Sequence, residues 1–200
     1  SLGTDQVKGL QGTQIAAFST DQIKALGTGQ IASLETSQIK SLTVAQLGAM
    51  STGQIAAFET QDLQQLSAVQ IKGLDTAQIQ ALTTGQASAL SAAQIKGMST
   101  GQIAALETQD LAKLGTEQLA ALSAAQVKAL STDQVQSLST DQVKGLQAAQ
   151  ISALSTDQIK AMGTGQIASL ETSQIKSLTA AQLGAMTTGQ IGRASCRERV

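Results

Sequence analysis

The chain has 200 residues and a narrow alphabet, with no His, Pro, Asn, Trp or Tyr, one Cys, two Phe and a net charge of −1. The missing residue types exclude ordinary zinc and haem ligand sets and the Ser-His and Cys-His catalytic relays. The near-neutral charge and the scarcity of aromatic side chains argue against nucleic-acid binding, and no apolar run approaches the roughly 20 residues that span a membrane.

An eight-residue repeat, the octad, runs from Gly3 through Gln190 without insertion or deletion. Its positions are numbered here slot 1 to slot 8, and Ser19–Leu26 (STDQIKAL) shows the pattern. Slot 2 is mostly Thr, slot 4 is mostly Gln, and slot 5 is Ile, Val or Leu except at Ala87. Slot 7 is usually Gly, Ala or Ser, and slot 8 is Leu, Met or Phe in every complete octad.

The period of eight restricts the secondary structure. The large apolar residues are separated by three and five positions, so a strand would place them on opposite faces. A continuous α-helix overshoots two turns by about 80° per octad, which winds the apolar stripe around the helix, and the period fits neither coiled-coil repeat. We therefore predict an all-α repeat solenoid with one very short capped helix per octad. A β-solenoid and a largely disordered low-complexity array remain alternatives.

The polar residues predict where each helix begins. Slot 1 is Ser, Thr, Asp or Gly in most octads, which favours an N-cap, and Gln at slot 4 then completes a capping box. The apolar residues on either side of the cap, such as Phe18 and Ile23, match a hydrophobic staple. Acidic residues early in the octad and Lys at slot 6 suit a helix dipole renewed in each repeat. We expect helices of about one and a half turns, separated by two-residue bends, with small slot 7 residues allowing close backbone approach.

Three features vary along the array. The octads that begin at Glu59 and Glu107 carry Gln at slot 3 and Asp at slot 4. Lys recurs at every second octad over long stretches, which predicts two octads, or sixteen residues, per solenoid coil. Ser19–Ile55 recurs as Ser155–Ile191 with three changes, which indicates that whole runs of octads were duplicated.

The last ten residues, Ile191–Val200 (IGRASCRERV), have a different composition and hold all three Arg and the one Cys. They resemble the translation of a common short-read sequencing adapter over their whole length. We predict an octad solenoid over residues 1–190, cut from a longer array and reading frame, and a non-native tail over residues 191–200. A genuine basic tail is the alternative. Without the tail, the net charge changes from −1 to −3.

Two polar series are candidate binding groups. Gln at slot 4, which begins as Gln22, Gln30 and Gln38, is a candidate binding ladder, but helix capping or a stacked amide ladder explains it better. The carboxylates are candidate calcium ligands, yet they are scattered singly and match no calcium-binding loop. We therefore predict no metal site and treat the carboxylates as a solvated face matched to the helix dipoles.

The Thr series at slot 2 is a third candidate, because a regular Thr array is the type of surface that binds ice. Ala and Val replace Thr at this slot, at Ala68 and Val44 for example, which favours an ordinary first-turn residue. A Ser-Lys catalytic pair is allowed by residue type, but no octad is distinctive enough to be a site. We predict no catalytic residue and no cofactor.

The octad Ser131–Leu138 (STDQVQSL) is similar to repeats in very large exoproteins of Gram-negative bacteria, which are labelled haem-utilisation or adhesion-related. The resemblance covers Gly3–Gln190 and implies an extracellular or cell-surface location and an adhesin-like role. It carries over no functional residue, because the repeat supplies none. The possible axial haem ligands are four Met at slot 8, a core position. They are Met50, Met98, Met162 and Met186.

Two functions therefore remain. The first is a structural stalk without catalysis, whose partners within the chain are neighbouring repeats and whose host or cell-surface partners are reached through domains absent from this sequence. The second is a peptide- or glycan-binding superhelix. That function needs exposed positions that differ between octads, and Gln64, Gln65 and Lys113 are the conspicuous exceptions to the pattern.

Overall fold

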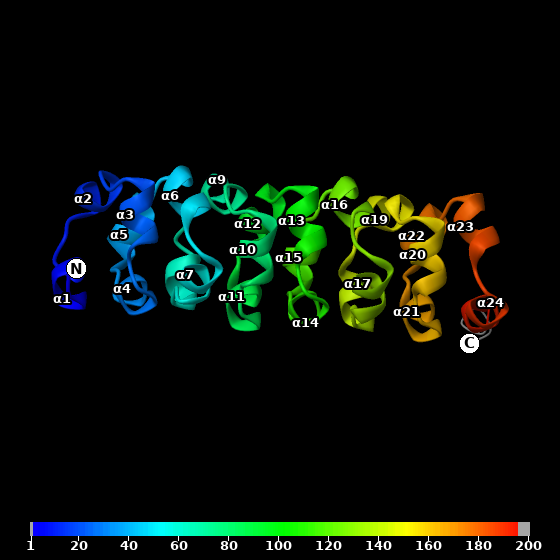
Figure 1. Ribbon diagram of the computed structural model, residues 1–200. Helices are drawn as coiled ribbons and strands as arrows, with labels where there is room; N and C mark the ends of the chain where they lie inside the picture. Colours follow the sequence, from blue (N-terminus) through cyan, green and yellow to red (C-terminus); the bar gives the residue numbers. More distant parts are fainter. Residues whose placement is uncertain (1, 196–200) are drawn as a thin grey trace. The chain divides into compact units, whose positions relative to one another are not determined.

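The computed structural model describes residues 2–195, and the side chains as far as Gly192. The described residues form short α-helices and no strands, one helix per octad (Figure 1). The helices are α1 Thr4–Lys8, α2 Gly12–Ala16, α3 Thr20–Lys24, α4 Thr28–Ala32, α5 Thr36–Ser41, α6 Val44–Ala49, α7 Thr52–Ala56, α8 Thr60–Leu63, α9 Ala68–Lys72, α10 Thr76–Gln80, α11 Thr84–Ala89, α12 Ala92–Gly97, α13 Thr100–Ala105, α14 Thr108–Leu111, α15 Thr116–Ala120, α16 Ala124–Lys128, α17 Thr132–Ser137, α18 Thr140–Gly145, α19 Ala148–Ala153, α20 Thr156–Ala161, α21 Thr164–Ser169, α22 Thr172–Ser177, α23 Ala180–Ala185 and α24 Thr188–Ser195. The expected all-α repeat array is confirmed. Of the predicted tail, residues 196–200 lie outside the described residues.

Each helix from α1 to α23 begins directly after slot 1, as the capping pattern predicts. Ser19 precedes α3 with φ −68° and ψ 161°, and its side chain accepts a hydrogen bond from the Gln22 backbone N–H. Such a cap satisfies one of the backbone donors that the first helical turn leaves unpaired. At Gly27, which has no side chain to accept this bond, the backbone keeps the same extended conformation, with φ −73° and ψ 158°. The cap geometry therefore belongs to the repeat and does not depend on glycine.

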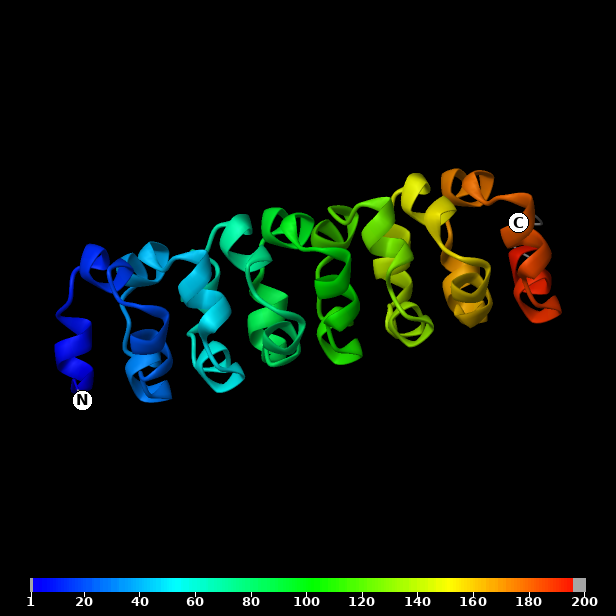
Figure 2. The same ribbon diagram turned by 45° about the horizontal axis from the view of Figure 1, so that its top comes forward.

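The chain divides into two compact units, Ser1–Leu106 and Glu107–Val200. In each unit a helix packs against the helix three places later, so α4 lies beside α7 in the first unit and α21 beside α24 in the second (Figures 1 and 2). Hydrogen bonds between successive coils join residues 28 to 31 positions apart. A coil therefore contains between three and four octads.

The predicted coil of two octads is wrong. Each helix is only four to six residues long before α24, and each bend keeps an extended backbone. Two such repeats are too short to bring the chain back beside its first helix. Helices of successive coils therefore meet only after three repeats. Nothing in the structure explains the recurrence of Lys at every second octad.

The core consists of the side chains at slots 5 and 8. Ile71 and Ile103 at slot 5 are 0 % exposed, and Leu74 and Leu106 at slot 8 are 4 % and 3 % exposed. The helices are too short to bury a face alone, so packing between coils must supply their stability. The prediction of a shared Ile and Leu core is confirmed.

Small residues at slot 7 permit this close packing, also as predicted. A Cβ atom added at Gly97 would lie 2.7 Å from the Ala68 Cβ, and one added at Gly145 would lie 2.8 Å from the Thr116 Cβ. In both cases slot 7 faces slot 2 of the helix three places earlier. A larger slot 7 side chain in these octads would therefore push two helices apart.

Candidate functional site

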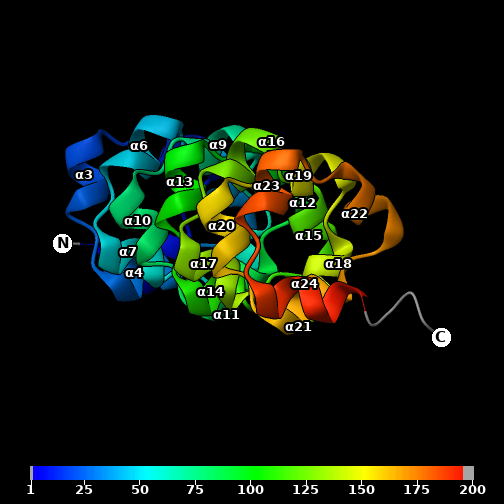
Figure 3. The same cartoon turned by 90° about the vertical axis from the view of Figure 1, so that its right-hand side faces the viewer.

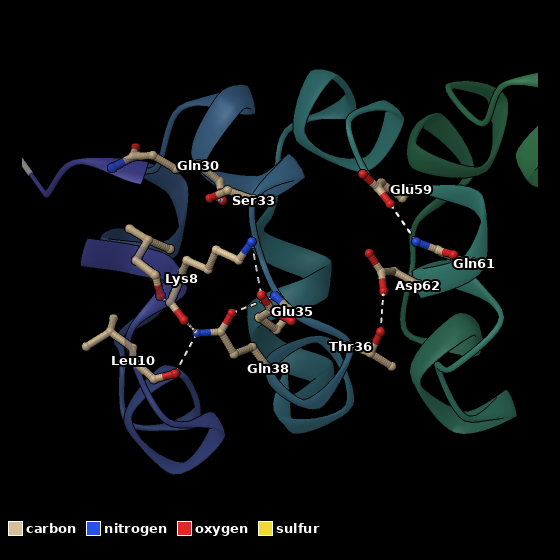
Figure 4. Close-up of polar contacts among 11 residues, drawn as sticks. Lys8, Leu10, Gln30, Ser33, Glu35, Thr36, Gln38, Glu59, Gln61 and Asp62 are labelled. Atoms are coloured by element: carbon tan, nitrogen blue, oxygen red, sulfur yellow. Dashed lines mark hydrogen bonds and ion pairs between the residues drawn. The ribbon is translucent and has the colours of Figure 1, made fainter. Parts of the chain in front are cut away.

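The Gln series at slot 4 forms a hydrogen-bond ladder between coils. The Gln38 Oε1 accepts from the backbone N–H of Glu35 at 2.7 Å, within its own octad. Its Nε2 donates to the carbonyl oxygens of Val7 at 2.8 Å and Leu10 at 2.6 Å, at the end of α1 (Figure 4). One side chain thus caps the start of its own helix and the end of a helix four octads earlier.

The same bond to the slot 8 carbonyl 28 residues earlier recurs through both units. Its donors are Gln30, Gln38, Gln46, Gln54, Gln70, Gln78, Gln86, Gln94 and Gln102 in the first unit and Gln142, Gln150, Gln158, Gln166, Gln174, Gln182 and Gln190 in the second. Most of these side chains are buried, and Gln38 is 1 % exposed. Their amides are engaged inside the protein, as the predicted capping role requires, and a ligand would have to break the coil contact to reach them.

The octad Glu59–Leu66 replaces one rung of this ladder with Asp62. The side chain of Asp62 is 5 % exposed and accepts a hydrogen bond from the Thr36 hydroxyl at 2.9 Å. It points toward α5, while Gln61 at slot 3 turns outward and donates to the Glu59 carboxylate at 2.7 Å (Figure 4). A carboxylate cannot donate to the carbonyl of Leu34, the residue 28 positions earlier. The coil contact here therefore depends on Thr36 instead.

The shorter helix of this octad fits the change. Helix α8 has four residues, and no side-chain cap bond forms at Glu59. Its slot 7 residue, Gln65, is exposed and stands where most octads from Gly27 onward carry a small buried or half-buried residue. The octad at Glu107 has the same arrangement, with a four-residue helix and an exposed Lys113 at slot 7. The two exceptions in the sequence, Asp at slot 4 and a large residue at slot 7, thus belong to one structural variant.

Burial raises the pKa of the Asp62 carboxyl, because desolvation disfavours its charged form. The hydrogen bond from Thr36 acts in the opposite direction, and the neighbouring charges of Glu59 and Glu35 raise the pKa further. The Glu35 carboxylate also forms an ion pair with Lys8 at 3.2 Å, on an exposed surface where such a pair contributes little stability.

These carboxylates do not build a metal centre. Across the part of the chain that the structure describes, no group of three His, Cys, Asp or Glu side chains is placed to hold a metal ion. Asp62 is turned toward the Thr36 hydroxyl, and Glu59 toward the Gln61 amide (Figure 4). The donor atoms that calcium needs therefore do not converge here.

The remaining candidate residues have structural positions. Thr20, Thr28 and Thr36 each occupy the first position of a helix, as the first-turn interpretation predicts. The four Met side chains lie in the core, between 3 % and 9 % exposed, in separate octads: they are Met50, Met98, Met162 and Met186. A buried Met at a Leu position is a packing residue, so this arrangement does not fit axial haem ligands.

The sequence analysis missed the second half of the Gln ladder. A capping box explains why Oε1 is needed at slot 4, but Glu also satisfies a capping box. The almost complete preference for Gln over Glu was the available signal, because only the amide offers an NH₂ donor as well as an acceptor.

Comparison with known families also identifies the chain as a repeat array. The ALTTAQ repeat matches six times, at residues 1–36, 28–58, 55–92, 103–140, 138–172 and 161–193. The chain belongs to the ALTTAQ repeat family. The six residues that give the family its name, ALTTAQ, resemble Ala81–Gln86 (ALTTGQ) in this chain, which stand at slots 7 and 8 of one octad and slots 1 to 4 of the next. These residues close one helix and cap the following helix. No curated protein matches the sequence.

Proposed function

We propose that this ALTTAQ repeat array is a structural stalk segment of a large secreted or surface-attached bacterial adhesin-like protein, without a catalytic role. The Gln ladder carries the proposal, because Gln at slot 4 makes the same bond to the slot 8 carbonyl of an earlier octad in octad after octad. Such an array can change in length by whole octads while every coil contact is kept. The duplicated run Ser19–Ile55 and Ser155–Ile191 is consistent with growth of this kind.

The resemblance of the octad to repeats in giant exoproteins supports an extracellular or cell-surface location. Host or cell-surface molecules would then be bound by other parts of such a protein, and the octads would interact with one another. No helix among the described residues is both long and apolar enough to span a membrane.

The first experiment is long-read sequencing of the locus, which recovers the reading frame around these octads. An export signal, further octads and a distinct terminal domain are the expected result. A short reading frame without an export signal would contradict the surface stalk. The same sequence tests our proposal that residues 191–200 come from an adapter, since the genomic reading frame would then continue differently after Gln190.

A functional test can then separate length from sequence. Residues 123–154 form four octads that can be deleted in the recovered protein, or exchanged for a second copy of the four octads at residues 67–98. A stalk predicts that deletion lowers attachment of the producing cells and that the exchange restores it. Equal loss of attachment in both variants would show that specific residues matter, which contradicts a stalk.

A peptide- or glycan-binding superhelix is the second candidate. The observation in its favour is the exposure of Gln64 and of its neighbour Gln65, which stands at slot 7, where most octads place a small residue. Binding of the chain to peptide and glycan arrays tests it directly. Selective binding that is lost when Gln64 and Gln65 become Ala, and kept when the exposed Gln136 becomes Ala, would favour this function over the stalk.

A further inference from the structure

Helix α8 is joined by the Gln ladder to the following coil but not to the preceding one. On the following side, the Nε2 atom of Gln94 donates to the carbonyl oxygen of Leu66 at 2.7 Å, just after α8 ends. On the preceding side, an ionised Asp62 has no hydrogen to donate to the carbonyl of Leu34. Its carboxylate instead accepts a hydrogen bond from the Thr36 hydroxyl of α5 at 2.9 Å. The contact between α8 and α5 therefore depends on a titratable side chain.

The helices before and after α8 along the chain keep the ladder bond. Gln54 in α7 donates to the carbonyl of Leu26 at 2.8 Å, and Gln70 in α9 donates to the carbonyl of Leu42 at 2.7 Å. Helix α7 lies next to both α4 and α10 (Figure 3). A Gln amide has no ionisable group, and these two contacts are therefore independent of the pH.

Two further acidic groups act on Asp62 in this contact (Figure 4). Glu59, at slot 1 of the same octad, and Glu35, directly before α5, both raise the pKa of the Asp62 carboxyl, although burial raises it most. The hydrogen bond from Thr36 lowers this pKa. In its ionised form, Asp62 is thus stabilised by a neutral hydroxyl and destabilised by two like charges and by burial.

Among the described residues, no cation lowers the pKa of Asp62. Lys8 forms an ion pair with Glu35 at 3.2 Å on an exposed surface. Lys40, in α5, is also exposed. Helix α8 packs against α5 and α11, and the octad of α11, residues 83–90, contains no ionisable side chain. Protonation of Asp62 itself is therefore the change that removes the buried charge.

We propose that the contact between α8 and α5 is a pH-sensitive joint of the first unit, which opens locally when Asp62 is ionised and closes when it is protonated. The contacts of α7 and α9 with their preceding coils stay closed in both states. Opening returns the ionised carboxylate to water, where its charge costs least. Helix α8 opposes the opening little, because it has four residues and no side-chain cap bond at Glu59. The joint does not depend on the stalk proposal.

The direction of the response follows from proton linkage. Asp62 binds its proton more tightly in the closed contact than in water, because its pKa is raised in the folded protein. Acid therefore favours the closed contact. A rise in pH from the ordinary carboxyl range to the raised pKa favours the open contact. The array is thus closed more tightly in acid at one defined coil, while its helix caps stay the same.

Amide hydrogen exchange of the full chain, recorded at acidic and neutral pH, tests the joint. Each rate is divided by the intrinsic exchange rate at that pH, and the amides of α7 and α9 serve as internal references. Protection of the amides at residues 63–66 should rise severalfold from neutral to acidic pH, while protection in α7 and α9 changes much less.

Three variants separate the charge of Asp62 from its structural role. Asp62→Asn keeps the size of the side chain and removes its ionisable group, so protection at residues 63–66 should stay at the wild-type acid value at both pH values. Thr36→Val removes the donor and should lower protection severalfold at neutral pH but less in acid. Asp21→Asn is the matched control, because it removes the same charge at an exposed position of the first unit and should keep the wild-type response.

Circular dichroism checks that each variant is folded, and the titration of the Asp62 carboxyl carbon by NMR tests the wild-type chain directly. This carbon should titrate above the ordinary range of Asp, in step with the change in protection. A folded Asp62→Asn variant that keeps the wild-type response would overturn the proposal. The same conclusion would follow if residues 63–66 responded to pH no more than α7 and α9, or if Asp62 titrated like an exposed Asp.

Discussion

Ser19–Ile55 and Ser155–Ile191 have nearly the same sequence, but the first lies near the start of the first unit and the second near the end of the second unit. They differ only in Leu26 and Met162, Val44 and Ala180, and Ser51 and Thr187. Both copies form one capped helix per octad, and helices α5 and α22 have the same length and caps. The start of each helix is therefore set by the octad itself, whereas its last residue is not, because the identical octads at Gly27 and Gly163 form helices of five and six residues.

The burial of the two copies is different. Gln22 is exposed, while its counterpart Gln158 is 3 % exposed and donates to the carbonyls of Val127 and Leu130 at 3.1 and 2.6 Å. Conversely, Leu47 is 0 % exposed and its counterpart Leu183 is 46 % exposed. One copy lacks a coil on one side, and the second copy lacks a coil on the opposite side. The same residue is thus a core residue or a surface residue according to its neighbours.

The two copies should differ most in the free energy of unfolding that is lost when a slot 5 side chain is truncated. Leu47→Ala should lower the free energy of unfolding by about 3–5 kcal/mol, because it opens a cavity between coils. Leu183→Ala should lower it by less than about 1 kcal/mol, because much of this side chain is already in water. Urea unfolding of both variants measures the two values. Similar losses would show that the C-terminal coil is covered in solution.

The second difference concerns slot 4. Gln158→Glu should cost about 2–3 kcal/mol at neutral pH, since it removes two donated bonds and places a carboxylate against carbonyl oxygens. Gln22→Glu should cost less than about 0.5 kcal/mol, because the site is exposed and Glu preserves the capping box. Burial raises the pKa of a carboxyl at position 158, so the loss should shrink as the pH falls. Chemical denaturation at several pH values tests both expectations.

The octad Glu59–Leu66 allows a similar comparison within the first unit, between Asp62 and the Gln that stands at slot 4 in the neighbouring octads. Asp62→Gln should restore the ladder bond to Leu34 and raise the free energy of unfolding by about 1 kcal/mol at neutral pH. The pKa of Asp62 is raised in the folded protein, so the native state holds its proton more tightly than the unfolded chain. Its contribution to stability is therefore present at low pH and declines as the pH rises through the ordinary carboxyl range to the raised pKa.

The advantage of Asp62→Gln should accordingly be smallest in acid. Asp62→Asn is the control, because its amide can still meet Thr36 but is too short to reach the carbonyl of Leu34. Unfolding curves recorded at acidic and neutral pH compare the three proteins. If Asn stabilises the protein as much as Gln, the removal of the buried charge is decisive and the missing ladder bond is not.

The smallest expected difference lies at slot 6. A Cβ added at Gly184 meets nothing within 4 Å, whereas one added at its counterpart Gly48 lies 3.1 Å from the carbonyl oxygen of Gly73 in the next coil. Gly184→Ala should raise the free energy of unfolding by about 0.5–1 kcal/mol, because Ala favours the helix. At Gly48 crowding should cancel this gain. Thermal unfolding followed by circular dichroism compares the two variants, and an equal gain at both sites would mean that the coils separate easily.

Much of the fold could be predicted from the octad because its signals are local. The cap at Ser19, the capping box with Gln22 and the small residue at slot 7 all act within one octad or at its boundary. The number of octads per coil could not be predicted, because it depends on the angle between successive helices. The regular spacing of Lys suggested two octads, but the Lys side chains are exposed, and the slot 6 backbone carbonyl accepts from a Gln of the next coil at Ala16 as well as at Lys8.

The candidate site was likewise predictable only in part from the sequence. The sequence marked Asp62 and Gln65 as exceptions, but it did not show that both result from one change in the packing of α8 against α5. Nor could it show that the Nε2 atom of Gln38 reaches the end of α1, 28 residues earlier. A side-chain donor needs an acceptor, and in this array the acceptor comes from another coil.

The sequence by itself determined where each helix of this protein begins and which residues are apolar enough to be buried. The tertiary structure decided which of those residues are buried, and by which coil. The physical reason is that capping is completed among residues a few positions apart. Burial of the Ile and Leu side chains and of the Gln amide requires a helix of a neighbouring coil, which lies three or four octads away along the chain.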